Sequence, residues 1–122
     1  MNAAGEASAA CTSAVPAIGA TSKTWGETLD LYQQAKGHSQ RAAKSDKQWE
    51  GLDYAVSTLV QSWTEVVAAG GRDTTDRSIP ADKKAAALAA EARWATAATR
   101  AEDLIRSECG TLSGSTASTR SG

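Results

Sequence analysis

The chain holds two cysteines, Cys11 and Cys109, which stand 98 positions apart at the two edges of its patterned region. Their spacing fits neither a metal-binding motif nor a C-x-x-C redox motif. A bridge closing so long a loop would stabilise a small domain by about 4–5 kcal/mol in the chain-entropy model. We therefore expect a Cys11–Cys109 disulfide formed outside the cytoplasm, where such bonds persist. Two unrelated cytosolic thiols, or a lipidated Cys11, are the alternatives.

Between the cysteines, apolar residues recur at helical spacings, and no window shows the sustained alternation of a strand. The clearest stretch starts between Ser39 and Asp46 and ends at Gly70-Gly71. Its apolar seam consists of Trp49, Leu52, Val56, Leu59, Trp63 and Val66. Alanine dominates the apolar composition, favours helix and lets helices approach closely. The sequence predicts an all-α fold, a small up-down bundle of three long helices.

Two further helical stretches flank the central one. The first covers about residues 13–36, with Gly37 as its stop, and the last covers about residues 80–109, with Gly110 as its stop. In the last stretch the main apolar stripe consists of Leu88, Ala92, Ala95, Thr99 and Ile105, with Trp94, Ala98, Ala101 and Leu104 beside it.

Small residues dominate both ends of the chain. We expect disordered tails at residues 1–10 and at the Ser/Thr/Gly-rich residues 111–122, around one bundle domain over residues 11–110. A length of 122 residues suits a single domain. No apolar run approaches the roughly 20 residues that cross a bilayer, so we expect no membrane span in this chain.

The disulfide and a straight first helix are incompatible in a three-helix bundle. A helix over residues 13–36 would span about 36 Å, whereas a disulfide needs Cα atoms within about 7 Å of each other. A break near Gly19–Thr24 resolves the conflict, because residues 12–23 then form a loop or a short fourth N-terminal element that lets the ends meet. The capping box Thr24-Trp25-Gly26-Glu27 favours a helix that starts there.

The sequence lacks the residues of ordinary catalytic and metal sites. His38 is the only histidine, so neither a zinc site nor a Glu-x-x-His di-iron site can be assembled. The carboxylate pairs Glu27 with Asp30, Glu50 with Asp53, and Glu102 with Asp103 lie near Lys or Arg, as solvated helix faces do. The formal charge of −1 argues against a nucleic-acid partner, which requires a cationic excess. We expect no catalytic residue, no metal and no cofactor.

Two sets of side chains are candidates for contact with a partner. The first is a local basic cluster, which also suits an anionic surface or an acidic partner: Lys36, His38, Arg41, Lys44 and Lys47. The second is the set of indoles, which would be anchors if displaced outward from the core: Trp25, Trp49, Trp63 and Trp94. For both sets the alternative is a structural role, as a solvated helix face and as core packing.

Trp49-Glu50-Gly51 resembles the W-x-G tripeptide of the small helical-hairpin proteins exported by type VII secretion systems. It lies between two helical stretches, where that family carries it, and the resemblance implies a secreted protein that pairs with another helical chain. The family's Tyr-x-x-x-Asp/Glu export signal is missing, since Lys36 follows Tyr32 at that spacing and Thr58 follows Tyr54.

Taken together, these features favour a non-enzymatic helical module that binds or senses a protein or cell-envelope partner outside the cytoplasm, secreted or membrane-tethered, as a monomer or homodimer. One alternative is a secreted protein that acts by pairing with another helical chain. The other is a small-ligand carrier or an enzyme with a pocket between helices, which a cavity with convergent polar groups would support.

Overall fold

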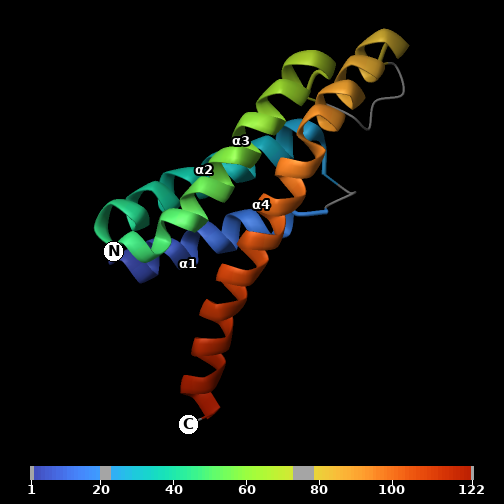
Figure 1. The fold of residues 1–122 in the computed structure, drawn as a ribbon. Coiled ribbons are helices and arrows are strands. Elements are labelled where there is room, and N and C mark those ends of the chain that lie inside the picture. The colour runs from blue at the N-terminus through green and yellow to red at the C-terminus, as the bar shows by residue number, and fades with distance from the viewer. Residues whose placement is uncertain (1, 20–22, 73–78, 122) are drawn as a thin grey trace.

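The computed structural model describes residues 2–19, 23–72 and 79–121, with side chains as far as residue 112. Its elements are α1 (Ala3–Ala14), the 3-10 turn η1 (Val15–Ala17), α2 (Trp25–Ser45), the 3-10 turn η2 (Lys47–Trp49), α3 (Glu50–Gly70) and α4 (Ala81–Ser121). Successive helices run in opposite directions, and α4 extends past the others at its C-terminal end (Figure 1). The described residues form no strand, so the predicted all-α bundle with a fourth N-terminal element is confirmed.

The first predicted stretch is broken where the disulfide requires it. The turn η1 ends at Ala17, and Gly19 has a φ of 69°, a left-handed conformation that glycine adopts without strain. The helix α2 then starts behind a complete capping box. The Thr24 hydroxyl accepts a hydrogen bond from the Glu27 N–H at 3.1 Å, and the Glu27 carboxylate accepts one from the Thr24 N–H at 2.9 Å. The predicted break is confirmed.

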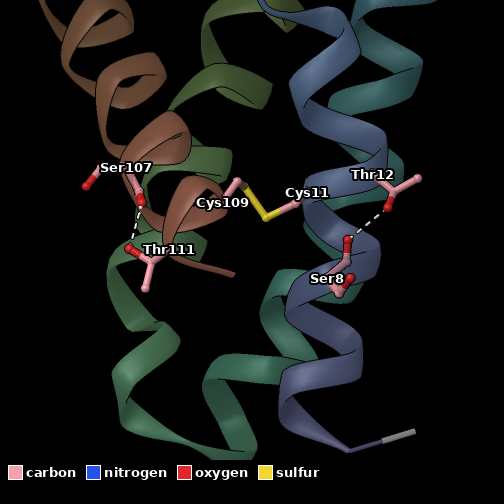
Figure 2. Close-up of a disulfide and its surroundings, with 6 residues drawn as sticks. All are labelled: Ser8, Cys11, Thr12, Ser107, Cys109 and Thr111. Atoms are coloured by element: carbon pink, nitrogen blue, oxygen red, sulfur yellow. Dashed lines mark hydrogen bonds between the residues drawn. A yellow bond between two sulfur atoms is a disulfide. The ribbon is translucent and has the colours of Figure 1, made fainter. Parts of the chain in front are cut away.

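The predicted disulfide is also confirmed. Cys11 on α1 and Cys109 on α4 are bonded, with their Cα atoms 5.7 Å apart (Figure 2). Apart from this bond, α1 packs mainly against α2 and touches α4 only locally. The bond therefore ties the first helix to the last.

The expectation of a disordered tail at residues 1–10 is wrong, because residues 3–10 belong to α1. Asn2 caps this helix by accepting the Gly5 N–H at 2.7 Å. Its contact face consists of Ala7, Ala10 and Ala14, all fully buried. Because these side chains are small, α1 packs closely against its neighbours. A prediction based on bulky apolar residues does not detect such a helix.

Two predicted helix ends also differ from the structure. Gly37 lies inside α2, because one interior glycine costs only about 1 kcal/mol and the buried Ala35 and Ala42 pack on either side of it. The helix instead ends at Ser45, and the carboxylate of the next residue, Asp46, accepts the Gln48 N–H at the start of η2. At the other end, Gly110 lacks the left-handed φ of a helix stop, and α4 runs on to Ser121 where a tail was predicted.

The main core joins all four helices around Tyr32, Leu52, Leu59 and Ile105, and the predicted α3 seam faces it. A smaller cluster, Val66 with two alanines of α4, lies at the far end of α3. Over residues 81–112, the buried side chains of α4 are Ala87, Ala90, Ala101, Ile105 and Cys109. The main stripe predicted on α4 is therefore wrong except at Ile105, since Leu88, Ala92, Ala95 and Thr99 are exposed.

Candidate functional site

The predicted basic cluster does not form one free patch. On α2, Arg41 donates from Nε to Oε2 of Glu6 at 2.7 Å, and Nδ1 of His38 lies 3.1 Å from the same oxygen. Lys36 donates to the Ser57 hydroxyl at 2.6 Å and lies 3.7 Å from Asp53. These three side chains therefore attach α2 to α1 and α3.

Glu6 is the acid that holds α1 in this arrangement, and it is only 8% exposed. Burial raises the pKa of Glu6, but hydrogen bonds from His38 and Arg41 and the charge of Arg41 outweigh that effect, so the net pKa lies below its ordinary value. The cluster thus has a structural role at these positions.

The remaining two members, Lys44 and Lys47, are exposed. Lys44 borders an open hollow between α2 and α3 together with Glu50, Asp53 and Tyr54. The charges around this hollow are mixed. Tyr54 itself is 74% exposed and also borders a second hollow, between α3 and α4, beside Arg100.

None of the four tryptophans is fully exposed. Trp49 is buried in the main core, whereas Trp25, Trp63 and Trp94 are half-buried. Trp25 packs against Gly70 in the smaller cluster, and Trp63 contacts both clusters. Nε1 of Trp94 donates to Oε2 of Glu65 at 2.5 Å. Of the four, Trp63 combines a core contact with a position on the wall of a groove.

That groove lies between α3 and α4, has a volume of about 220 Å³, and is named here the acidic groove. Its lining residues are Ser62 and Trp63 on α3 and Glu91, Ala95, Ala98, Thr99 and Glu102 on α4. The α4 residues follow from helical spacing, since positions 91, 95, 98 and 102 recur every three or four residues. Two carboxylates, an indole and a hydroxyl thus share one hollow.

Ser62 is the unusual member of this set. The hydroxyls of Ser57, Thr58 and Thr64 on the same helix each donate to the carbonyl four residues earlier. Ser62 makes no such bond, and within the described chain its hydroxyl has no hydrogen-bond partner although the residue is only 4% exposed. The Ser62 oxygen is not one of the fully buried side-chain atoms without a partner, which among the described residues are Tyr32 Oη and Trp49 Nε1. It therefore opens onto the groove, where water or a ligand can form a hydrogen bond with it.

The two glutamates of the groove are half-buried, and neither lies within ion-pair distance of a cation in the described part of the chain. The nearby cations are engaged elsewhere, Arg93 with Glu65 at 3.6 Å and Arg106 with Asp103 at 3.8 Å. Burial raises the pKa of Glu102, and Asp103 adds to the rise while Arg106 opposes it. Arg106 has a larger effect on Glu102 than Asp103 does, so the negative charge of the groove is only partly compensated.

Sequence reasoning missed Ser62, Glu91 and Tyr54, and it treated Glu102 as half of a solvated pair. The structure separates that pair, because Asp103 is exposed while Glu102 faces the groove. Helical spacing could have placed Glu91 and Glu102 on one face of α4. No sequence signal shows that the Ser62 hydroxyl lacks a partner.

No protein-family model, curated protein sequence or solved structure matches this chain. Among residues 2–19, 23–72 and 79–121, no helix is long and apolar enough to cross a membrane. Over the same residues, no group of three or more His, Cys, Asp or Glu side chains could hold a metal ion. The candidate site therefore rests on the geometry of the acidic groove.

Proposed function

We propose that this protein is a non-enzymatic binding module of an extracytoplasmic compartment, and that it holds a small cationic ligand in the acidic groove. The observation that carries the proposal is the lining of the groove, where the Ser62 hydroxyl, which has no hydrogen bond within the described residues, lies beside an indole and two carboxylates that form no ion pair. A hydroxyl that forms no bond within the fold and lines a groove is available to form a hydrogen bond with a ligand. The site has no histidine, no cysteine and no paired base and nucleophile, which supports binding rather than catalysis.

The compartment is inferred from the Cys11–Cys109 bond. Disulfides persist in oxidising environments and are reduced in most cytosols. Intact mass of protein isolated from its native compartment under thiol-alkylating conditions tests this. An oxidised, unlabelled protein supports the proposal, and two labelled thiols contradict it.

The ligand class can be tested by NMR on the ¹⁵N-labelled, oxidised chain. Spermidine, n-butylamine, citrate and glucose would be titrated separately while the amide of Ser62 and the indole N–H of Trp63 are followed. We expect saturable shifts of both signals with at least one of the amines and none with citrate or glucose. Absence of any saturable shift at these two residues would contradict the proposal.

A pair of hydroxyl deletions on α3 provides the control. Ser62→Ala removes the unpartnered hydroxyl, and Thr64→Ala removes an exposed one that donates to the Val60 carbonyl. Loss of a hydrogen bond from a charged ammonium group should weaken amine binding about tenfold in Ser62→Ala, with no change in Thr64→Ala. Equal effects of the two variants would argue against a site at Ser62.

A second candidate function is pairing with another helical chain, and Leu88 favours it. This side chain is 51% exposed on α4, in line with the exposed Ala92 and Ala95. Light scattering at increasing concentration, with Leu88→Ser as the variant and the adjacent exposed Ala89→Ser as the control, tests this function. A dimer that only Leu88→Ser dissociates would support pairing, and a monomer at all concentrations would speak against self-pairing.

A further inference from the structure

We propose that the ligand of the acidic groove is a linear aliphatic polyamine, with terminal ammonium groups held by Glu91 and Glu102 and its methylene chain along Trp63. This inference rests on the proposed function and adds the chemical class of the ligand, namely a chain with positive charges at two separated points.

The spacing of the two carboxylates indicates an elongated ligand with two charges. Glu91 and Glu102 are eleven positions apart on α4. Eleven residues make about three helical turns, so the two side chains point in nearly the same direction with Cα atoms about 16 Å apart. Both line the same groove. Two carboxylates this far apart along one groove suit an elongated dication, and a single charge cannot contact both.

The residues between the carboxylates indicate that the middle of the ligand is aliphatic. On α4 they are Ala95, Ala98 and Thr99, whose small side chains leave room along the helix, and Trp63 forms the opposite wall from α3. An indole accepts aliphatic surface and attracts cations by about 0.5–2 kcal/mol. The middle of the groove therefore suits methylene groups and the ends suit ammonium groups.

Ser62 indicates a hydrogen-bond donor in the middle of the ligand. Its hydroxyl lies beside Trp63 on the groove wall and has no partner among the described residues. A hydroxyl oxygen can accept a hydrogen bond from an ammonium N–H. A polyamine with an inner secondary ammonium provides that donor, which a simple diamine lacks.

A divalent metal ion fits this groove poorly. Direct carboxylate coordination of Ca²⁺ or Mg²⁺ requires oxygens within about 2.6 Å of the ion, and two glutamates about three turns apart cannot both reach one ion. Over the described residues no group of three or more His, Cys, Asp or Glu side chains could hold a metal ion. A basic peptide is a different class of ligand, and the test below separates it.

The test is calorimetric titration of the oxidised chain at low ionic strength with spermidine, 1,5-diaminopentane, n-butylamine and tri-lysine. We expect spermidine to bind tightest and n-butylamine at least tenfold more weakly, because a monoamine leaves one carboxylate unpaired. Glu91→Gln and Glu102→Gln should each weaken spermidine binding about tenfold, the usual effect of losing a charge-assisted hydrogen bond. Each single variant should leave n-butylamine affinity within about threefold of the parent value, since the other carboxylate remains.

The control is Asp82→Asn, which removes an exposed carboxylate at the start of α4, outside the groove. Its spermidine affinity should stay within about twofold of the parent, as expected for a screened surface charge. An Asp82→Asn effect as large as that of Glu91→Gln would overturn the inference, since binding would then reflect overall charge. Circular dichroism of each variant confirms that it is folded before titration.

Two further outcomes separate this inference from the proposed function. If n-butylamine binds at Ser62 and Trp63 as tightly as spermidine, the polyamine inference is wrong and the cation-binding function stands. If tri-lysine binds more tightly than spermidine, the ligand is a basic peptide and the inference is overturned. If no amine binds, the inference and the proposed function both fail.

Discussion

Cys11 and Cys109 are 98 positions apart in sequence, yet their Cα atoms lie 5.7 Å apart and their sulfur atoms are bonded. Reduction of this bond leaves α1 attached through alanine contacts and the Glu6 cluster. We expect a Cys11→Ser/Cys109→Ser variant to lose about 4–5 kcal/mol in free energy of unfolding, from the loop entropy restored to the unfolded chain. Urea denaturation of the oxidised parent and the variant measures the difference.

The parent protein in reductant is the matched control, because it removes the bond without changing any residue. It should unfold at nearly the same urea concentration as the double variant. A double variant as stable as the oxidised parent would show that the bond does not constrain the unfolded chain as expected.

The fold was predictable where apolar side chains are large and regularly spaced. The α3 seam from Trp49 to Val66 and the Thr24–Glu27 box are explicit in the sequence, and the distance limit of a disulfide implied the break before Thr24. The helix α1 was missed because its buried face consists of alanines. The helix ends predicted at Gly37 and Gly110 were wrong because a glycine ends a helix only when its backbone leaves helical geometry.

The candidate site was less predictable, because it depends on tertiary contacts. In the sequence, the exposed stripe of α4 resembles a core-facing stripe, because leucine and alanine occur both in cores and on surfaces. Burial of Ser62 and the separation of Glu102 from Asp103 follow from how α4 is rotated against α3. Alanine-rich helices specify such rotation weakly, because side chains of nearly equal size occupy every face.

Gly70 lies where three helices converge, and we expect Gly70→Ala to destabilise the protein. A methyl group there would lie 2.6 Å from Cβ of Ala87 and clash with the ring of Trp25. Overpacking of this kind costs about 1–3 kcal/mol, which outweighs the gain of about 1 kcal/mol from alanine in a helix. Thermal unfolding should show a lower midpoint.

Gly37→Ala is the control for this change, since it adds the same methyl group inside α2. There the nearest neighbour is Nη1 of Arg41 at 3.6 Å, an ordinary contact. We expect it to stabilise the protein by up to about 1 kcal/mol. Stabilisation by both substitutions would mean that the helices move apart freely at Gly70.

Glu6 should give the protein a pH-dependent component of stability. Burial raises its pKa, and hydrogen bonds from His38 and Arg41 lower it further than burial raises it, so the folded pKa lies below the ordinary value of 4.5. Glu6 therefore contributes stability above about pH 4.5, and that contribution is lost as the pH falls through the folded pKa. The melting temperature of Glu6→Gln should fall below the parent's at pH 7 and approach it at pH 3.

Glu50→Gln, at an exposed carboxylate, is the comparison for Glu6 and should leave the pH profile unchanged. Asp46, whose pKa is lowered by hydrogen bonds from Gln48, should preserve part of the acid sensitivity in both variants. A constant difference between Glu6→Gln and the parent from pH 7 to pH 3 would contradict the assigned role of the carboxylate.

Tyr32 buries its hydroxyl completely, and within the described residues this group has no hydrogen-bond partner. Burial, and then the charge of Glu102, raise the pKa of this phenol well above its ordinary value. We expect Tyr32→Phe to be neutral or to stabilise by about 1 kcal/mol, because it removes an unsatisfied polar group at nearly constant shape. Tyr54→Phe, at an exposed tyrosine, should change nothing. A loss above about 1 kcal/mol in Tyr32→Phe would reveal a buried water bonded to the hydroxyl.

Glu102→Gln should raise stability at neutral pH while it weakens amine binding. Burial raises the pKa of Glu102, so the group favours the folded state fully below its ordinary pKa of 4.5 and that contribution is lost as the pH rises. The melting temperature of Glu102→Gln should therefore exceed the parent's at pH 7 and equal it at pH 4. Asp103→Asn, which removes an exposed carboxylate paired with Arg106, should give no such gain.

A residue that lowers the stability of the unliganded protein and is required for ligand binding is typical of a binding site. A Glu102→Gln variant that binds spermidine like the parent would remove Glu102 from that role.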